Sequence, residues 1–232
     1  MKILSLLEII WGVFYDSGHG SAEVMGFEHT QWWISGWSGT ASDRVVTVRL
    51  RPLPPMLTNV VLTALQTCEG TEYAVEGPCG FCGGTLSGYD TRSKRFAVIG
   101  DDDGDHPLKV NLHRAYCRSC GRILMPEEPF YPGTRLGSPV VDLCRAFSAT
   151  MSSGLVATRL GQMGVKVDRW SVRAYSRLPY SLPPTIAAFG MNVPVSIISL
   201  SSLSVIPGGS CGARGRDVLN ACNYPSRNTL IP

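Results

Sequence analysis

The stretch CGFCG at positions 79–83 and its counterpart CRSCG at positions 117–121 decide how this chain folds. Each places two cysteines three positions apart on a short turn, so that both thiolates can bind one metal ion. A glycine follows each pair, and glycine adopts the left-handed backbone that such a turn often needs without steric cost. Together the two turns offer four sulfur ligands, which is a complete tetrahedral set.

We therefore predict a structural zinc site, with Zn²⁺ as the cofactor. Its four ligands are Cys79, Cys82, Cys117 and Cys120. The two pairs are separated by 34 residues, more than the roughly 15–20 that are usual, and this interval has room for an extended β-hairpin. The pattern is that of a zinc ribbon, and removal of zinc is expected to unfold residues 76–125. Four unrelated reduced cysteines, or two local disulfides, are the alternatives, but matched turns of this kind seldom arise by chance.

The composition is that of a folded chain. Its 232 residues suffice for one large domain or two to three small ones, and 44% are hydrophobic against 17% charged, so a core can form. Eight cysteines are too few for a secreted disulfide scaffold of this length, and a reducing, cytoplasmic setting is expected. The apolar run at residues 1–15 is interrupted by Glu8 and too short to span a bilayer, so no membrane association is predicted.

Positive charge is concentrated in the middle of the chain. Residues 1–78 hold 4 basic and 8 acidic side chains, whereas residues 105–180 hold 11 and 5. A local basic excess favours a polyanionic partner. An ordinary solvated surface can carry the same excess, so charge alone does not identify the partner.

Changes in composition divide the chain into five segments. Residues 1–55 show no clear periodicity and are left unassigned: either the start is misassigned and Met56 is the first residue, or the segment is a genuine small N-terminal element. The others are a leading helix and zinc ribbon at 56–125, a proline-rich linker at 126–138, a helix-turn-helix at 139–180 and a C-terminal extension at 181–232. The predicted fold class is α+β, with a small antiparallel ribbon followed by a three-helix unit.

Within the ribbon, strands are predicted at residues 85–89, 95–99 and 108–116, with an acidic turn at 101–105. His106 and His113 are interpreted as surface residues, because four cysteines already complete the metal site. Three helices are predicted after the linker. The first opens with Ser138 as N-cap and has Cys144 in its apolar stripe. The second starts after Ser152-Ser153 and ends at Gly164, and the third covers 169–177 with Asp168 as N-cap.

The third of these helices is amphipathic. Val172 and Tyr175 share one face, which is predicted to point inward. The opposite face is predicted to carry Arg169, Trp170, Arg173 and Arg177. Three helices in this order have the anatomy of a helix-turn-helix, whose last helix reads DNA.

The stretch GVKVDRWSVRAY at 164–175 resembles a segment of insertion-sequence transposases, in which a Gly-Val-x-Val turn precedes a capping residue and a [Ser/Thr]-Val-x-x-[Trp/Tyr] recognition helix. These transposases commonly carry a four-cysteine zinc ribbon before the helix-turn-helix, so the resemblance covers about residues 76–180. It implies binding of double-stranded DNA through the third helix. The residues at the matching positions are Arg169, Trp170, Ser171 and Arg173, and Arg177 is the next outward arginine. A three-helix packing module without a nucleic-acid partner is the alternative.

Residues 181–232 depart from that family. A transposase continues into a nuclease domain with three metal-binding carboxylates, but the one acidic residue here is Asp217. A single carboxylate cannot hold two divalent ions, so the protein is not expected to be an enzyme. Residues 193–205 read as a buried strand or a short helix, residues 217–222 as one helical turn, and Cys211 and Cys222 as free thiols.

Two functions follow from these observations. The first is a non-enzymatic, zinc-containing DNA-binding protein, either derived from a transposase or similar to a transcription regulator. The second is a protein–protein interaction module built on the zinc ribbon. The outward arginines favour the first, and the exposed Trp170 fits both, because aromatic side chains also anchor protein interfaces.

The unassigned segment leads to a prediction about the native protein. If translation starts at Met56, mass spectrometry of the native N-terminus will identify Met56 as the first residue. Tryptic peptides from residues 1–55 will then be absent from a digest that covers the rest of the chain. Recovery of such a peptide would contradict the shortened form.

Overall fold

The structure is a computed structural model that describes residues 52–188, 190–204 and 213–222. This part of the chain is mixed α+β, with six helices, a four-stranded mixed sheet and a separate two-stranded hairpin. The questions about residues 1–51 and Cys211 lie outside the described residues. No helix within the described ranges is long and apolar enough to cross a membrane.

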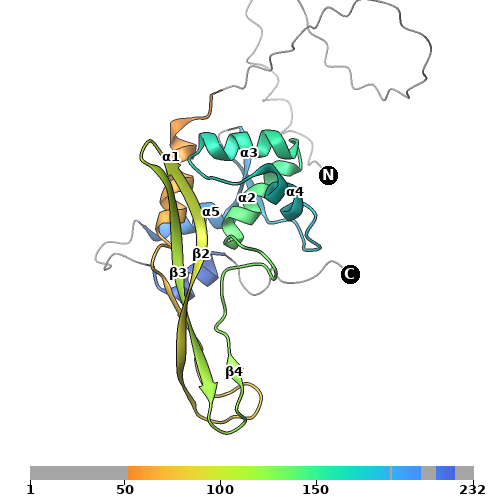
Figure 1. Ribbon diagram of the computed structural model, residues 1–232. Coiled ribbons are helices and arrows are strands. Elements are labelled where there is room, and N and C mark those ends of the chain that lie inside the picture. The colour runs from red at the N-terminus through yellow and green to blue at the C-terminus, as the bar shows by residue number, and fades with distance from the viewer. Residues whose placement is uncertain (1–51, 189, 205–212, 223–232) are drawn as a thin grey trace, which may run out of the picture. The chain divides into compact units, whose positions relative to one another are not determined.

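A long β-hairpin dominates the sheet (Figure 1). β2 (Leu86–Asp101) pairs antiparallel with β3 (Gly104–Cys117) from end to end. The strands predicted at 85–89 and 95–99 belong to one continuous strand, because the polar residues between them also pair with β3. The pairing shifts register at two places, between Gly88 and Asp90 and between Arg95 and Ala97. The predicted acidic turn closes the hairpin, and Gly104 there has a φ of 127°, which side chains rarely adopt.

β3 is the central strand of the sheet. β2 occupies one of its edges, and two short strands follow one another along the other. β1 (Glu72–Ala74) runs parallel to residues 111–113 of β3, and β4 (Ile123–Leu124) runs antiparallel to residues 115–116. The chain segments on either side of the hairpin are thereby both attached to β3.

Three helices follow the linker, as the sequence predicts. They are α2 (Ser138–Ser148), α3 (Ser153–Gln162) and α4 (Arg169–Tyr175). Ser138 is the first residue of α2 rather than its N-cap, which is Gly137. The Ser152 hydroxyl accepts from the Leu155 amide and caps α3, so this helix begins at Ser153 and not after it. α3 packs against α4, and α2 contacts both of them.

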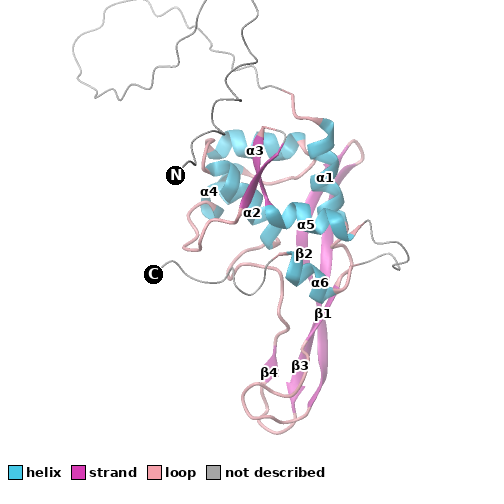
Figure 2. Cartoon of the chain, turned by 180° about the vertical axis from the view of Figure 1, so that it is seen from behind, coloured by secondary structure: helices cyan, strands magenta, loops and turns pink. Residues whose placement is uncertain are grey.

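The C-terminal segment is integrated into the fold. β5 (Thr185–Ala188) and β6 (Met191–Pro194) form the second sheet, followed by α5 (Val195–Leu203) and α6 (Gly215–Ala221). The segment read as a strand or a helix is thus the end of a strand and then a helix. α5 packs along α1 (Pro55–Gln66), as Figure 2 shows from behind.

One hydrophobic cluster joins these elements. It contains Leu65 from α1, Phe130 from the linker, Phe147 from α2 and Leu200 from α5. All of the described residues accordingly belong to one compact unit. Burial within α1 falls on Leu57, Val61, Ala64 and Leu65, whereas Met56 in its first turn is 64% exposed.

The hairpin enters this core with one half only. Its buried members there are Phe96, Ala97, Ile99, Leu108, Val110 and Leu112. The linker also crosses β2 closely at this point: the Gly137 amide donates to the Phe96 carbonyl at 2.7 Å, and a Cβ on Gly137 would lie 2.4 Å from the Phe96 ring. The half of the hairpin that carries the cysteines contributes no side chain before Phe96 or after Leu112 to the cluster.

The packing of α5 on α1 leads to a prediction. Leu200 is fully buried, so Leu200→Ala should lower the free energy of unfolding by about 2–5 kcal/mol through lost burial and a residual cavity. Ser202→Ala, at an exposed position of the same helix, is the matched control and should change it by less than about 0.5 kcal/mol. Urea denaturation followed by circular dichroism measures both, and equal effects would contradict the packing.

Candidate metal centre

Each cysteine turn folds back on its first cysteine. The Gly83 amide donates to the Cys79 carbonyl at 2.8 Å, and the Gly121 amide donates to the Cys117 carbonyl at 2.9 Å. Both glycines have a φ of 70°, a conformation that a side chain would strain. The two turns are therefore close copies, and the glycines predicted from sequence are required by the backbone.

A second glycine brings the two turns together. Gly84 follows the first turn, and its carbonyl accepts from the Cys79 amide at 3.0 Å. A Cβ on Gly84 would lie 2.3 Å from the Ser119 Oγ and 3.2 Å from the Cys117 Sγ. The first turn can thus approach the second only because position 84 has no side chain.

The four sulfur atoms form a compact cluster, with every pair within 4.8 Å. The Sγ atoms of Cys82 and Cys117 are 3.5 Å apart, and those of Cys79 and Cys120 are 3.8 Å apart. Tetrahedral zinc with Zn–S bonds of about 2.3 Å implies sulfur–sulfur separations of about 3.8 Å. Both of these contacts join one turn to the other, and all four cysteines are free, so local disulfides are not formed. The predicted four-cysteine set is confirmed as suitable for a metal ion such as zinc.

The thiols of this cluster do not titrate alike. The Cys120 amide donates to the Cys117 sulfur and is the main reason that the pKa of Cys117 is lowered to about 6. The Gly84 amide acts in the same direction on Cys82, but hydrogen bonds with the neighbouring sulfurs outweigh it and raise the pKa of Cys82 to about 12. The four thiols are so close that ionisation of one makes ionisation of the next less favourable. A divalent cation offsets this repulsion, because it coordinates all four as thiolates.

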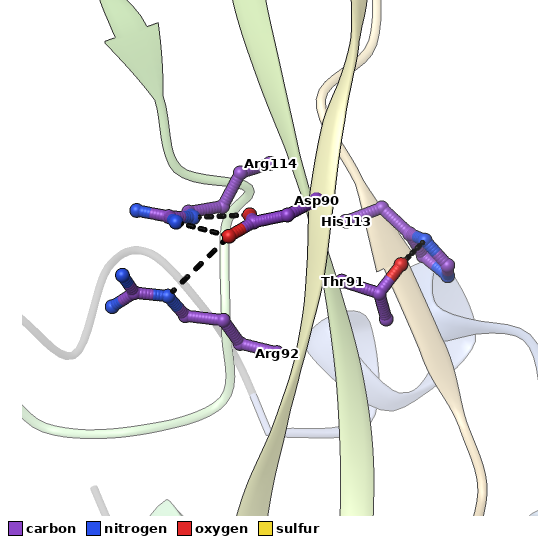
Figure 3. Close-up of polar contacts among 5 residues, drawn as sticks. All are labelled: Asp90, Thr91, Arg92, His113 and Arg114. Atoms are coloured by element: carbon purple, nitrogen blue, oxygen red, sulfur yellow. Dashed lines mark hydrogen bonds and ion pairs between the residues drawn. The ribbon is translucent and has the colours of Figure 1, made fainter.

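Polar side chains pair across the stem, the part of the hairpin between the cysteines and the core at residues 88–95 and 113–116 (Figure 3). Asp90 and Thr91 are neighbours on β2 and point to opposite faces of the hairpin. Arg114 donates to both carboxylate oxygens of Asp90, from Nε at 2.5 Å and from Nη2, and these hydrogen bonds lower the pKa of Asp90. On the other face, the Thr91 hydroxyl lies 2.9 Å from the His113 Nδ1. The stem is therefore held by surface contacts rather than by a core.

Within the described ranges, the histidines and the other cysteines lie apart from this centre. His113 pairs with Thr91, and His106 lies 3.1 Å from an oxygen of Asp101, so neither belongs to the four-cysteine cluster. Cys144 is fully buried, as predicted for a core residue, and burial raises its pKa above the ordinary range. Burial likewise raises the pKa of Cys222 to about 12.

The residues predicted to contact DNA all lie on or just beyond α4. Arg169, Trp170, Arg173 and Arg177 are exposed, whereas Ser171 is half-buried. The Ser171 hydroxyl donates to Asp168 at 2.6 Å, and the same carboxylate accepts from the amides of Trp170 and Ser171 at 2.9 Å. The Ser171 hydrogen bond is the largest reason that the pKa of Asp168 is lowered. In this structure Ser171 therefore supports the helix cap.

Comparison with known proteins identifies no family: no protein-family model, curated protein or solved structure matches the chain. The part of the predicted transposase resemblance that the structure supports is the four-cysteine metal site.

Sequence reasoning missed the apolar surface at the cysteine end of the hairpin. Five large hydrophobic side chains are exposed there: Phe81, Tyr89, Tyr116, Ile123 and Met125. Tyr89 and Tyr116 contact each other with ring centroids 6.5 Å apart, and the Arg122 guanidinium lies 4.3 Å from the Phe81 ring centroid. No sequence pattern signals this surface, because apolar residues in strands are usually read as core.

Metal content and its effect on folding are the first prediction from this site. The protein purified under reducing conditions should contain one zinc per chain by elemental analysis, and absence of metal would contradict the assignment. Chelation should abolish amide hydrogen-exchange protection in residues 76–92 and 114–125. Residues 96–112 should stay protected, because their side chains are held by the hydrophobic core. The region expected to unfold without metal is therefore smaller than the 76–125 predicted from the sequence, because it leaves out residues 96–112.

The substitution Gly84→Ala tests whether zinc binding depends on the close approach of the two cysteine turns. Gly84→Ala places a Cβ against Ser119, and overpacking of this kind costs about 1–3 kcal/mol, so zinc affinity should fall roughly tenfold or more. Gly80→Ala is the matched control, since nothing lies within 4 Å of its Cβ position and its φ is not positive. Competition with a chromogenic chelator measures both affinities. Equal affinities for the two variants would contradict the close approach.

Proposed function

We propose that the protein is a non-enzymatic, zinc-containing protein that binds double-stranded DNA, with α4 in the major groove. The observation that carries this proposal is the exposed arginine face of α4. Its supporting side chains are buried, so the face has one fixed orientation. The zinc site has the structural role of folding the hairpin end.

The helix is well anchored for this task. Val172 is fully buried, Tyr175 is 8% exposed, and Trp170 on the other face is 63% exposed. Arg169 and Arg173 are four positions apart and therefore share one helical face. α3 and α2 pack behind α4, which is the support that a recognition helix receives in a helix-turn-helix.

The charges around α4 favour a polyanion. Residues 138–188 contain six basic and two acidic side chains. Of the two acidic residues, Asp142 is fully buried, and Asp168 caps α4. None of the ion pairs among the described residues involves Arg169, Arg173 or Arg177. Their charges are thus available to phosphates, which dominate the affinity of proteins for DNA.

The start of α4 also offers a stacking surface. The Arg169 guanidinium lies 4.8 Å from the centroid of the Trp170 ring, and both side chains are exposed. An arginine held over an aromatic ring keeps its fork of donors in one orientation, which suits a bidentate contact to guanine or phosphate. The N-terminal end of a recognition helix is where such base contacts are made.

A transposase-derived or regulatory role follows from the sequence of this same region. The stretch at 164–175 resembles the recognition segment of insertion-sequence transposases, and the four-cysteine site precedes it in the expected order. The described C-terminal elements contribute to the core. Because residues 181–232 hold a single acidic residue, which cannot supply the carboxylates of a nuclease, we propose a DNA-binding protein without catalytic activity, in a reducing compartment such as the cytoplasm.

A second candidate is a protein–protein interaction module. The exposed aromatic and aliphatic side chains at the cysteine end of the hairpin favour it, because such side chains are typical of the centres of protein interfaces. This function and DNA binding use different parts of the molecule. They are therefore separable by mutation.

DNA binding is tested with Arg173→Ala in the zinc-loaded full chain. Loss of a phosphate contact should weaken binding to all duplexes alike and reduce the log–log salt slope by about one unit. Loss of a base contact should instead cost about 1–3 kcal/mol at the preferred site only. Arg95→Ala, which removes an exposed arginine from β2, is the control and should leave binding unchanged. Fluorescence anisotropy at several salt concentrations, on specific and random duplexes, measures these effects.

If the wild-type protein with its zinc intact shows no salt-dependent binding to DNA, the proposal fails. The interaction module then becomes the leading function. Trp170 and Phe81 are the residues to substitute first in that case, because they are the most exposed aromatic side chains of the described chain.

A further inference from the structure

A pocket of about 460 Å³ opens where the end of α2, the start of α3 and the end of α4 meet. Its lining has an unusual chemistry, with three arginines, three serines and no acidic residue. These side chains are Arg145, Arg173, Arg177, Ser148, Ser153 and Ser176. A concave site with this lining carries a positive potential, which its low-dielectric walls focus.

One of the arginines is built into the wall. Arg145 is 3% exposed, and its guanidinium donates to the backbone carbonyls of Ser181 (2.8 Å) and Tyr180. The Arg145 Nε and the Ser148 Oγ are both buried without a hydrogen-bond partner. Buried polar groups are nearly always paired in proteins, so these two atoms in the wall of the pocket have hydrogen-bonding capacity that the fold leaves unused.

The other two arginines face the open side. Arg173 and Arg177 are four positions apart and exposed, and they form no ion pair within the described part of the chain. Ser153 is the first residue of α3, so the positive end of that helix dipole adds to the same potential. Guanidinium groups and hydroxyls are the donors that tetrahedral phosphate oxygens accept from best.

We propose that this pocket is a phosphate-binding site. In the context of the DNA binding proposed above, on which this part of the inference rests, it receives one backbone phosphate beside α4 and fixes the register of that helix. The pocket is larger than an isolated phosphate group, which suits a phosphate that remains attached to a sugar. The same donors would accept a free phosphate-bearing ligand, and the experiment separates the two sources.

The first arm uses inorganic phosphate with the zinc-loaded full chain. In ¹⁵N-edited NMR spectra, phosphate should cause saturable shifts of the Ser148, Ser153 and Ser176 amides, and chloride at equal ionic strength should not. Arg177→Ala should weaken phosphate binding about tenfold or more, and Arg95→Ala should leave it unchanged. Absence of a saturable response in the pocket, or an unchanged response in Arg177→Ala, overturns the site.

The variant Ser148→Ala separates a loss of phosphate binding from a loss of stability. The Ser148 hydroxyl has no partner in the free protein, so its removal should leave the melting temperature unchanged or raised. Phosphate affinity should nevertheless fall. A variant with undiminished phosphate affinity contradicts the role of this hydroxyl in the site.

The second arm uses a random-sequence DNA duplex. If the pocket holds a backbone phosphate, Arg177→Ala should reduce the log–log salt slope by about one unit, and inorganic phosphate should compete with DNA more strongly in wild type than in this variant. DNA binding that Arg177→Ala leaves unaltered overturns the pocket as a backbone contact and leaves the proposed function standing. Phosphate binding without any DNA binding supports the site, assigns it to a free phosphate-bearing ligand and overturns the proposed function.

Discussion

Four sulfur atoms within 4.8 Å of one another are the constraint on which the hairpin end depends. That end has almost no hydrophobic core: the cluster that unites the rest of the unit takes hairpin side chains only between Phe96 and Leu112. Backbone pairing of two long strands is marginal in water without a packed face. A metal ion bound by the four cysteines would supply the missing stabilisation, because coordination of four thiolates converts binding free energy into folding free energy. The glycines at 83, 84 and 121 are what let the two turns come close enough to share one ion.

The hairpin is thus stabilised differently at its two ends. Near its closed turn, β2 and β3 are covered by helices and by the linker, which approaches so closely at Gly137 that no side chain fits. Near the cysteines, surface pairs such as Asp90 with Arg114 replace that cover. Exposed ion pairs contribute little to stability, so they orient the strands but do not substitute for the metal. This division explains why the apolar surface around Phe81 remains exposed and available for a partner.

The helical part shows how packing assigns roles to charged residues. Arg145 is drawn into the fold by backbone carbonyls that follow α4, whereas Arg173 and Arg177 stay at the surface. All three border one pocket. Asp168, which would otherwise oppose them, accepts three hydrogen bonds at the start of α4. The proposed DNA-binding face and the proposed phosphate site are therefore parts of one electropositive region.

Much of this arrangement is determined by the sequence alone. The spacing of the cysteines and their glycines predicts the metal cluster, because the geometry of the turn is local and the chemistry of thiolates is specific. Helical periodicity predicts α2, α3 and α4 and the inward positions of Val172 and Tyr175, since an amphipathic face is encoded in neighbouring residues. Local patterns of this kind carry over to the structure with small changes, such as the N-cap of α2 at Gly137 instead of Ser138.

The tertiary structure decided what depends on residues far apart in the chain. The packing of α5 on α1 makes the C-terminal segment part of the core, and it joins positions separated by more than a hundred residues, which no local periodicity encodes. The continuous strand β2 depends on its pairing with β3 across two register shifts. The pocket proposed to bind phosphate is lined by side chains from the ends of three helices that are distant in the sequence. Burial is a property of the assembled chain, so the exposed aromatics at the hairpin end and the arginine pocket appear only when the fold is complete.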